Sequence, residues 1–300
     1  MNISANGIVL NEFGELLLIQ RDDTHTFAPP GGGCEINELP NKTAEREVEE
    51  ETGIKARAVR LVGLDFLPSR PLPFLFLHFR CIQRGGTLNA SSESAQVGFF
   101  NANPPPGPML PMHRKQIENG FSHAGGAPQW GRLPYGLGSR FGFFLLNRLI
   151  YPWLALSRKR RGEPAYSPPP NWVVSTKFIF QNEKGQMLWE HNGDHWALPA
   201  SHASADRPPW ELAPESLPAA GDNDLRLTDL KHIAVMKDRP EMCFVFSGNL
   251  TVSAARQLPA TFAYFSPGDE PTETLPPDRA IAVAALHAAG PTTMAIGDSP

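Results

Sequence analysis

The sequence has few of the residues that would cross-link or anchor it. Its three cysteines among 300 residues are isolated, so they form neither a disulfide framework nor a metal-binding spacing. Its N-terminus lacks the basic and apolar segments of a secretory signal, and we expect it to form a strand. These absences favour a reducing, cytoplasmic compartment. The length predicts about two domains, each able to bury a core without covalent staples.

Acidic charge is missing from one stretch of the chain. No Asp or Glu lies between Glu118 and Glu163, although seven basic residues do: Arg132, Arg140, Arg148, Arg158, Lys159, Arg160 and Arg161. Proline-rich segments at residues 104–108 and 168–170 bracket this stretch, and we interpret residues 126–170 as a linker. The whole chain carries 27 basic and 31 acidic residues, and we expect no DNA partner.

The linker contains one apolar run, at residues 141–156, which is too short to cross a membrane. Sixteen helical residues would span about 24 Å, against a hydrocarbon core of roughly 30 Å. Pro152 would also interrupt such a helix. We expect this run to be buried between the two halves of the chain. The alternatives are an anchor to anionic lipid through residues 158–161 and a disordered tether.

A run of carboxylates lies in a pattern framed by glycines. Residues 32–54 read G-x5-E-x7-R-E-U-x-E-E-x-G-U, where U is aliphatic. The nine specified positions are Gly32, Glu38, Arg46, Glu47, Val48, Glu50, Glu51, Gly53 and Ile54. The stretch from about residue 41 to residue 52 predicts a helix. Gly53 follows that helix, where a left-handed conformation is needed.

Three of these glutamates share one face of the predicted helix. Glu47, Glu50 and Glu51 fall within about 100° of one another, whereas Glu45 and Glu49 point to the opposite side. Neighbouring carboxylates weaken a helix by a few tenths of a kcal/mol, and a divalent cation removes that penalty. Hard oxygen ligands of this kind suit Mg²⁺ or Mn²⁺. A merely solvated acidic helix would not explain the spacing of the glycines and Glu38.

This pattern is the Nudix box, and residues 1–122 resemble a Nudix hydrolase. The resemblance implies an α/β fold, a Nudix-type α/β/α sandwich with a mixed sheet. It also implies a pyrophosphohydrolase that cleaves a diphosphate linkage in a nucleoside diphosphate derivative with Mg²⁺ or Mn²⁺. The metal ligands implied are Glu47, Glu50, Glu51 and Gly32 through its carbonyl, supported by Glu38 and Arg46.

Residues outside the box complete the implied site. Arg21 ends the second predicted strand, where many Nudix enzymes place an arginine that reaches the substrate phosphates. Phe27, which follows it, is a second candidate for substrate binding. Glu93 lies in a Ser-rich loop that often supplies a further carboxylate, so the catalytic base is left open among Glu47, Glu50 and Glu93. The scattered histidines, His25, His78 and His113, are interpreted as structural.

The second half of the chain repeats short motifs of the first. Residues 182–185 (NEKG) match residues 11–14 (NEFG), and residues 196–199 (WALP) match residues 27–30 (FAPP). Residues 239–240 match 70–71, residues 264–265 match 99–100, and Arg279 matches Arg114. A nearly constant offset indicates an internal repeat. We therefore predict a catalytic domain at residues 1–125, the linker, and a degenerate Nudix-like domain at residues 171–300.

The second copy has lost the carboxylates. Glu47, Glu50 and Glu51 correspond to Ser216, Ala219 and Ala220. Pro214 and Pro218 argue against a long helix there. We expect no metal in this copy and a monomer with two pseudo-symmetric halves.

Two other functions remain open at this point. One is a nucleotide-binding sensor without turnover, although such proteins often carry a damaged box. The other is a hydrolase that contacts RNA or an anionic membrane through residues 132–162.

Overall fold

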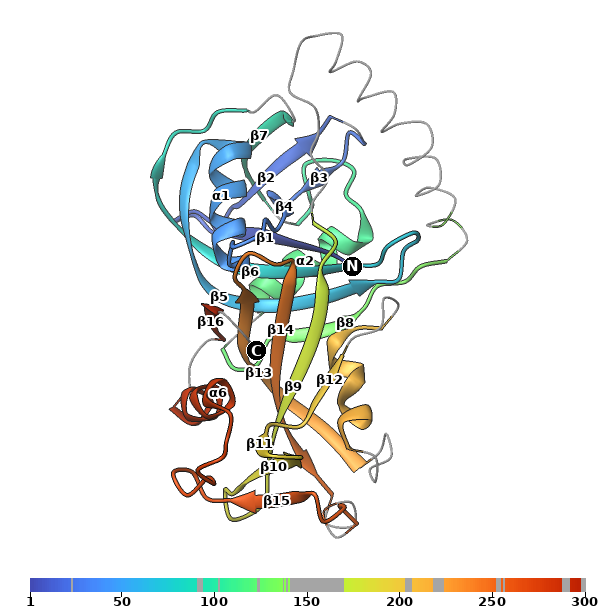
Figure 1. Ribbon diagram of the computed structural model, residues 1–300. Helices are drawn as coiled ribbons and strands as arrows, with labels where there is room; N and C mark the ends of the chain where they lie inside the picture. The colour runs from blue at the N-terminus through green and yellow to red at the C-terminus, as the bar shows by residue number, and fades with distance from the viewer. Residues whose placement is uncertain are drawn as a thin grey trace. The chain divides into compact units, whose positions relative to one another are not determined.

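The protein forms two compact units in the computed structural model (Figure 1). Unit 1 comprises residues 1–35, 40–122 and 129–171, and unit 2 comprises residues 36–39, 123–128 and 172–300. The structure describes residues 1–22, 24–90, 94–101, 103–122, 125–136, 138, 140, 170–202, 207–217, 224–251, 255, 257–287 and 292–297. Glu93 and the apolar run at residues 141–156 lie outside these ranges, as do the basic residues 158–161. No helix of the described ranges is long and apolar enough to span a membrane.

Unit 1 contains one mixed sheet. Its strands are β1 (Asn2–Leu10), β2 (Leu16–Arg21), β3 (Phe27–Ala28), β4 (Gly31–Gly33), β5 (Ile54–Leu67), β6 (Phe74–Gly86), β7 (Ser94–Phe100) and β8 (Gln129–Arg132). The order is β3-β2-β1-β6-β5-β8, with β4 on β1 and β7 on β2. The pairs β1–β6 and β5–β8 are parallel, and the other pairs are antiparallel.

Two helices cover opposite faces of this sheet: α1 (Pro40–Thr52) and α2 (Pro111–Ser122). A Cβ on Gly7 would lie 2.5 Å from Val48 of α1, so α1 packs directly on β1. The next residue of β1, Ile8, lies against Gly120 of α2. Successive strand residues point to opposite faces, so the arrangement is the predicted α/β/α sandwich.

The helix predicted from about residue 41 to residue 52 is α1, the strand expected at the N-terminus is β1, and the second predicted strand, β2, ends at Arg21 as expected. The prediction missed the short strands β3, β4 and β8, which have two to four residues each. The predicted domain boundary at residue 125 was therefore too early. Gln129 pairs with Gly63 of β5, and the first sheet ends only with β8.

Unit 2 contains a second sheet. Its strands are β9 (Val173–Gln181), β10 (Met187–Asn192), β11 (His195–Ala197), β12 (Ala200–His202), β13 (Leu225–Met236), β14 (Glu241–Leu250), β15 (Phe262–Phe265) and β16 (Thr293–Gly297). The order is β11-β10-β9-β14-β13-β16, with β12 on β9 and β15 on β10. Each strand thus takes the position of its counterpart in unit 1. Helix α6 (Pro276–His287) occupies the place of α2 in chain order.

The matched motifs take equivalent places in the two sheets. Asn11 and Asn182 each accept two backbone N–H bonds through the side-chain oxygen, in the same four-residue turn. Phe100 pairs with Leu16 as Phe265 pairs with Met187. These predicted matches are confirmed.

One predicted match was wrong. Residues 239–240 were matched with residues 70–71, but the carbonyl of Pro240 accepts from the first residue of β9. In unit 1 it is Pro73 whose carbonyl accepts from the first residue of β1. Pro240 therefore corresponds to Pro73. The shared Arg-Pro dipeptide gave a false match, because the loops that precede β6 and β14 differ in length.

The counterpart of α1 is a short 3-10 helix, η2 (Pro209–Ser216), with Pro214 inside it. Proline removes a backbone donor and clashes with the preceding turn, so an α-helix does not form there. Among the described residues at this place, the copy has a 3-10 helix of eight residues and no long α-helix, as Pro214 predicted. Ser216 lies in η2, whereas residues 219 and 220 fall outside the described ranges.

The end of α1 gives the first prediction. Gly53 has φ +74°, and a Cβ there would lie 2.3 Å from the carbonyl of Thr87. Gly14 has a similar φ of +76° but nothing within 4 Å of its Cβ position. We expect Gly14→Ala to cost about 1–2 kcal/mol, the penalty for a left-handed L-residue, and Gly53→Ala to cost clearly more. Urea unfolding of the two variants checks this, and equal losses would contradict it.

Candidate active site

The box residues of α1 face the glycine strand β4. Glu47 lies over Gly32, because a Cβ on that glycine would be 2.3 Å from Glu47 Oε1. The backbone N–H of Gly31 donates to Glu51 Oε2 at 2.9 Å. Two carboxylates therefore meet one stretch of backbone that carries no side chains. A larger residue at position 32 would displace Glu47, which explains the glycine in the pattern.

Arg46 contacts two carboxylates of the box and the backbone of β4. Its Nη1 lies 2.7 Å from Glu47 Oε1 and 3.1 Å from Glu50 Oε2, and Nη2 donates to the carbonyl of Gly33 at 3.2 Å. Both the helix and β4 are thus tied to a single guanidinium. The contact with Glu50 is the weaker one, since that side chain is 60% exposed and an exposed pair contributes little.

The other glutamates of the helix face away, as predicted. Glu45 accepts from the backbone of Ala58 at 3.0 Å and pairs with Lys42. Glu49 lies 3.5 Å from Lys55. Glu38 lies just before α1 and is partly buried, and its supporting role stays a prediction.

The carboxylates of Glu47, Glu50 and Glu51 are ligands of the type that a hard divalent cation prefers. Their oxygen atoms, however, do not converge on one position. Within the described ranges no three His, Cys, Asp or Glu side chains lie close enough to hold a metal ion. Glu47 and Glu50 are instead bridged by Arg46. Carboxylate oxygens beside an open glycine backbone fit Mg²⁺ or Mn²⁺ chemically.

The predicted substrate residues are placed differently. Arg21 ends β2, and its charge acts on His113 of α2, so the two side chains lie in the same neighbourhood. Phe27 is only 4% exposed and packs edge-on against Phe100 within the core. Its ring is covered by protein, and its role in substrate binding stays a prediction. The role of Glu93, outside the described ranges, does so too.

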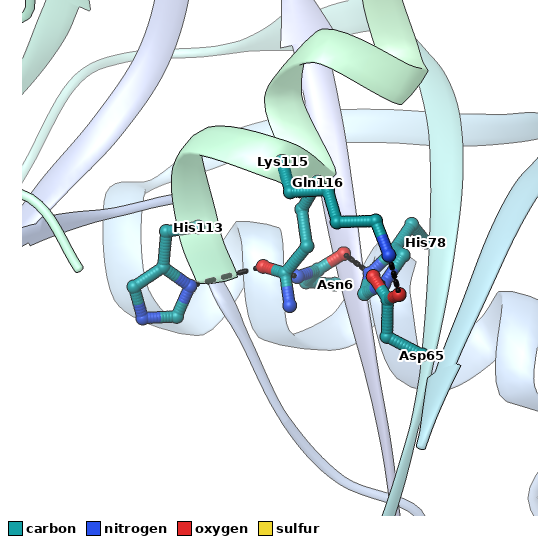
Figure 2. Close-up of polar contacts among 6 residues, drawn as sticks. All are labelled: Asn6, Asp65, His78, His113, Lys115 and Gln116. Atoms are coloured by element: carbon teal, nitrogen blue, oxygen red, sulfur yellow. Dashed lines mark hydrogen bonds and ion pairs between the residues drawn. The ribbon is translucent and has the colours of Figure 1, made fainter. Parts of the chain in front are cut away.

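A buried polar chain, which sequence reasoning missed, links the sheet to α2 (Figure 2). His78 contacts Asn6 Oδ1 through Nδ1 at 2.9 Å and Asp65 Oδ2 through Nε2 at 3.0 Å. Lys115 of α2 donates to Asp65 Oδ1 at 2.9 Å. Polar residues at buried positions of apolar strands β5 and β6 were the available signal, because such groups require partners.

The chain continues along α2. Asn6 Nδ2 donates to Gln116 Oε1 at 3.1 Å, and His113 Nδ1 lies 2.9 Å from the same oxygen. Figure 2 shows His113 and Gln116 extending from one helix toward Asn6. His78 and His113 were predicted to be structural, and both lie in hydrogen-bonded positions within this chain.

The polar chain shifts two ionisation equilibria. Burial alone would raise the pKa of Asp65, but the hydrogen bonds and charges of His78 and Lys115 lower it overall. The pKa of His113 falls from 6.5 to about 4, mainly because burial penalises the imidazolium. The charges of Arg21 and His78 add to this effect, which the hydrogen bond with Gln116 opposes. His113 is therefore neutral at pH 7.

The lowered pKa of His113 gives a pH prediction. The unfolded chain binds this proton near pH 6.5 and the folded chain near pH 4, so folding favours the neutral ring. Its stabilising contribution should be complete above pH 6.5 and should decline as the pH falls toward 4. NMR titration should place the pKa of His113 near 4. The variant His113→Gln should show a smaller change in the free energy of unfolding between pH 4 and pH 6.5 than the wild type. A midpoint near 6.5 would contradict this.

Comparison with known proteins places this site in a family. The NUDIX domain model matches residues 2–119. A MutT-like protein of Streptomyces ambofaciens is 39% identical over 99 residues, which cover 33% of this chain and 63% of that protein, less than two thirds of its length. A relative from Bacillus subtilis is 31% identical over 113 residues, covering 37% of this chain and 74% of that protein.

An 8-oxo-dGTP diphosphatase of Haemophilus influenzae is 45% identical over 56 residues, which cover 17% of this chain and 41% of that protein. The residues that the NUDIX model matches carry the box helix and every strand of its sheet except β8. The chain therefore belongs to the Nudix family, through a NUDIX domain at residues 2–119.

Proposed function

We propose that unit 1 hydrolyses a diphosphate linkage in a nucleoside diphosphate derivative, with Mg²⁺ or Mn²⁺. The observation that carries this proposal is the meeting of Glu47 and Glu51 with the backbone of Gly31 and Gly32. These contacts bring two carboxylates to the glycine backbone, which supports a site for a cation and a phosphate group. The Haemophilus influenzae relative bears a name that gives it a nucleotide substrate, which agrees with this substrate class.

Each residue has a separate task in the proposed reaction. Glu47, Glu50 and Glu51 would hold the cation, with the carbonyl of Gly32. The bound cation supplies a more acidic water and neutralises charge on the phosphoryl oxygens. Arg46 keeps Glu47 directed at Gly32 through the contacts described above. Arg21 would contact the phosphates, and Glu93 or a box glutamate would take the proton from water.

The complete box favours turnover over sensing. All nine positions of the pattern are filled, and Glu47 lies against Gly32. A protein that only binds nucleotides has no need for the full set. Contact with RNA or anionic membranes through residues 132–162 has no described structure to support it, and a cytoplasmic location stays a proposal.

Unit 2 repeats the strand order without the glutamate helix. We infer that it is a Nudix-like copy that lost catalysis and stands in for a second subunit. The expected state is a monomer with two pseudo-symmetric halves.

The metal dependence can be tested with a matched pair of variants. Glu50→Gln keeps the shape of the side chain but removes a charge that the cation needs, so kcat should fall by about 100-fold or more. Glu49→Gln, on the opposite side of the helix beside Lys55, should retain activity. Hydrolysis of nucleoside diphosphate derivatives should stop in EDTA and return with Mg²⁺ or Mn²⁺. Unchanged turnover in EDTA would refute the proposal.

The identity of the base can be tested separately. If Glu93 takes the proton, Glu93→Gln should lower kcat far more than it raises KM. The pH–rate profile should also lose its acidic limb. Ser91→Ala, in the same loop, serves as the control. Unaltered kinetics of Glu93→Gln would return the role to the glutamates of α1.

A further inference from the structure

A backbone hydrogen bond holds one of the box glutamates. The N–H of Gly31 in β4 donates to Glu51 Oε2 at 2.9 Å, and Glu51 is partly buried. In the proposed function, Glu51 is a metal ligand. Groups that hydrogen-bond a ligating carboxylate fix its orientation, and their loss weakens metal binding. The residues that hold Gly31 in place therefore bear on the site.

Asn6 of β1 lies directly against Gly31. The two residues are partners in the pairing of β1 with β4. A Cβ on Gly31 would be 2.4 Å from Asn6 Cβ and 2.6 Å from Asn6 Cα, far below van der Waals contact. The Cα of Gly31 thus rests on Asn6 with no side chain between them, so the backbone of Gly31 follows the position of Asn6.

The side chain of Asn6 is held by the buried polar chain (Figure 2). Its Oδ1 lies 2.9 Å from His78 Nδ1, and its Nδ2 donates to Gln116 Oε1 at 3.1 Å. His78 is fully buried and lies 3.0 Å from Asp65 Oδ2. Buried polar groups keep such contacts, because an unsatisfied partner costs free energy. His78 thus fixes Asn6, and Asn6 fixes Gly31.

This connection crosses the sheet. The side chain of Asn6 lies on the face that α2 covers, since it contacts Gln116. Glu51 belongs to α1, which covers the opposite face. The backbone of Gly31 stands between them and meets Asn6 on one side and Glu51 on the other. Contacts made beneath α2 are therefore carried to the box helix.

Unit 2 provides an internal comparison at the same register. Ala200 of β12 pairs with Lys177 of β9, at the position where Gly31 pairs with Asn6. The matching strands of unit 2 thus accommodate a Cβ. The pairing of these strands does not by itself require glycine, so the close contact of Gly31 with Asn6 has another cause.

The polar chain is also replaced at the matching positions of unit 2. Val245 of β14 pairs with Lys177, so an apolar side chain stands at the position of His78. Lys177 is held instead by Asp278 of α6, which stands at the position of His113. The contact of an asparagine with a histidine behind the glycine strand therefore belongs to the unit that keeps the complete box.

We propose that His78 and Asn6 are positioning residues of the box. They hold the backbone of Gly31 so that its N–H keeps Glu51 in the orientation of a metal ligand. His78, which is fully buried, acts only through Asn6. The proposal rests on the proposed function for the role of Glu51 as a ligand.

Two substitutions of His78 separate positioning from stability. His78→Phe removes both ring nitrogens and keeps a planar ring. His78→Asn keeps an amide group near the place of Nδ1, within reach of Asn6, but it is too short to reach Asp65. Both variants lose the contact with Asp65 and should lose similar stability, whereas only His78→Phe releases Asn6.

Amide hydrogen exchange of the metal-free full chain, followed by NMR, reports the bond from Gly31 to Glu51 directly. The Gly31 amide should exchange about tenfold faster in His78→Phe and less than about twofold faster in His78→Asn, since one hydrogen bond has an effect of this size. The amide of Leu77, in the middle of β6, reports opening of the whole sheet and serves as the reference.

The affinity for Mn²⁺ gives a second readout without turnover. Electron paramagnetic resonance measures free Mn²⁺ during titration of the full chain. Asn6→Ala and His78→Phe should each weaken binding about tenfold, since groups that orient a metal ligand contribute about that much. The double variant should bind no more weakly than either single variant, because His78 acts through Asn6. His78→Asn should bind as tightly as the wild type.

Circular dichroism confirms that each variant is folded, and Asn6→Ala carries both measurements if His78→Phe does not fold. The proposal is overturned if Gly31 exchanges at the wild-type rate in these two variants, or if His78→Asn loses as much as His78→Phe. Losses that multiply in the double variant also overturn it. A wild-type chain that binds no Mn²⁺ refutes both proposals, whereas one that binds Mn²⁺ but hydrolyses no nucleotide refutes the proposed function alone.

Discussion

The packing of α1 onto two glycines governs the geometry of unit 1. Gly7 lets Val48 approach β1, and Gly32 lets Glu47 lie over β4. A side chain at position 7 would clash with Val48 of the helix, and one at position 32 would displace the carboxylate of Glu47. The short distance between α1 and strands β1 and β4 allows three further contacts. It sets the orientation of the carboxylates, lets Arg46 reach Gly33, and lets Gly31 donate to Glu51. The polar chain is tied to the same region, since Asn6 pairs with Gly31.

A comparison with unit 2 separates the features that both sheets share from those found only in unit 1. In unit 2 the strand order, the Asn-based turn and the aromatic pairing survive without the glutamate helix. Unit 2 differs from unit 1 at the site. Ser216 of η2 corresponds to Glu47, and the buried ion pair of Lys177 with Asp278 stands at the positions of Asn6 and His113. The strand order of the fold therefore does not depend on the carboxylates of α1.

The sequence predicted those features that depend on local pattern. Glycine spacing and helical periodicity located α1 and its end at Gly53, because both depend on residues within one helix. The repeated Asn turn was recognisable for the same reason. Strand β8 was missed because its four residues gain their structure from β5, over sixty positions earlier. The partners within the buried polar chain could not be foreseen, since His78 joins β1 to β5 and Lys115 joins β5 to α2 through tertiary structure alone.

The sheet registers also bear on the order of folding during synthesis. Strand β1 pairs in parallel with β6 along nine residues, from Asn2 opposite Phe74 to Leu10 opposite Ile82. Such distant pairing requires a long loop to close first, so each sheet should form slowly compared with a helical bundle. Every strand of the first sheet, however, lies before residue 133. The nascent chain thus holds all strands of one sheet before the ribosome has begun the other, which lowers the risk that two near-identical topologies exchange strands.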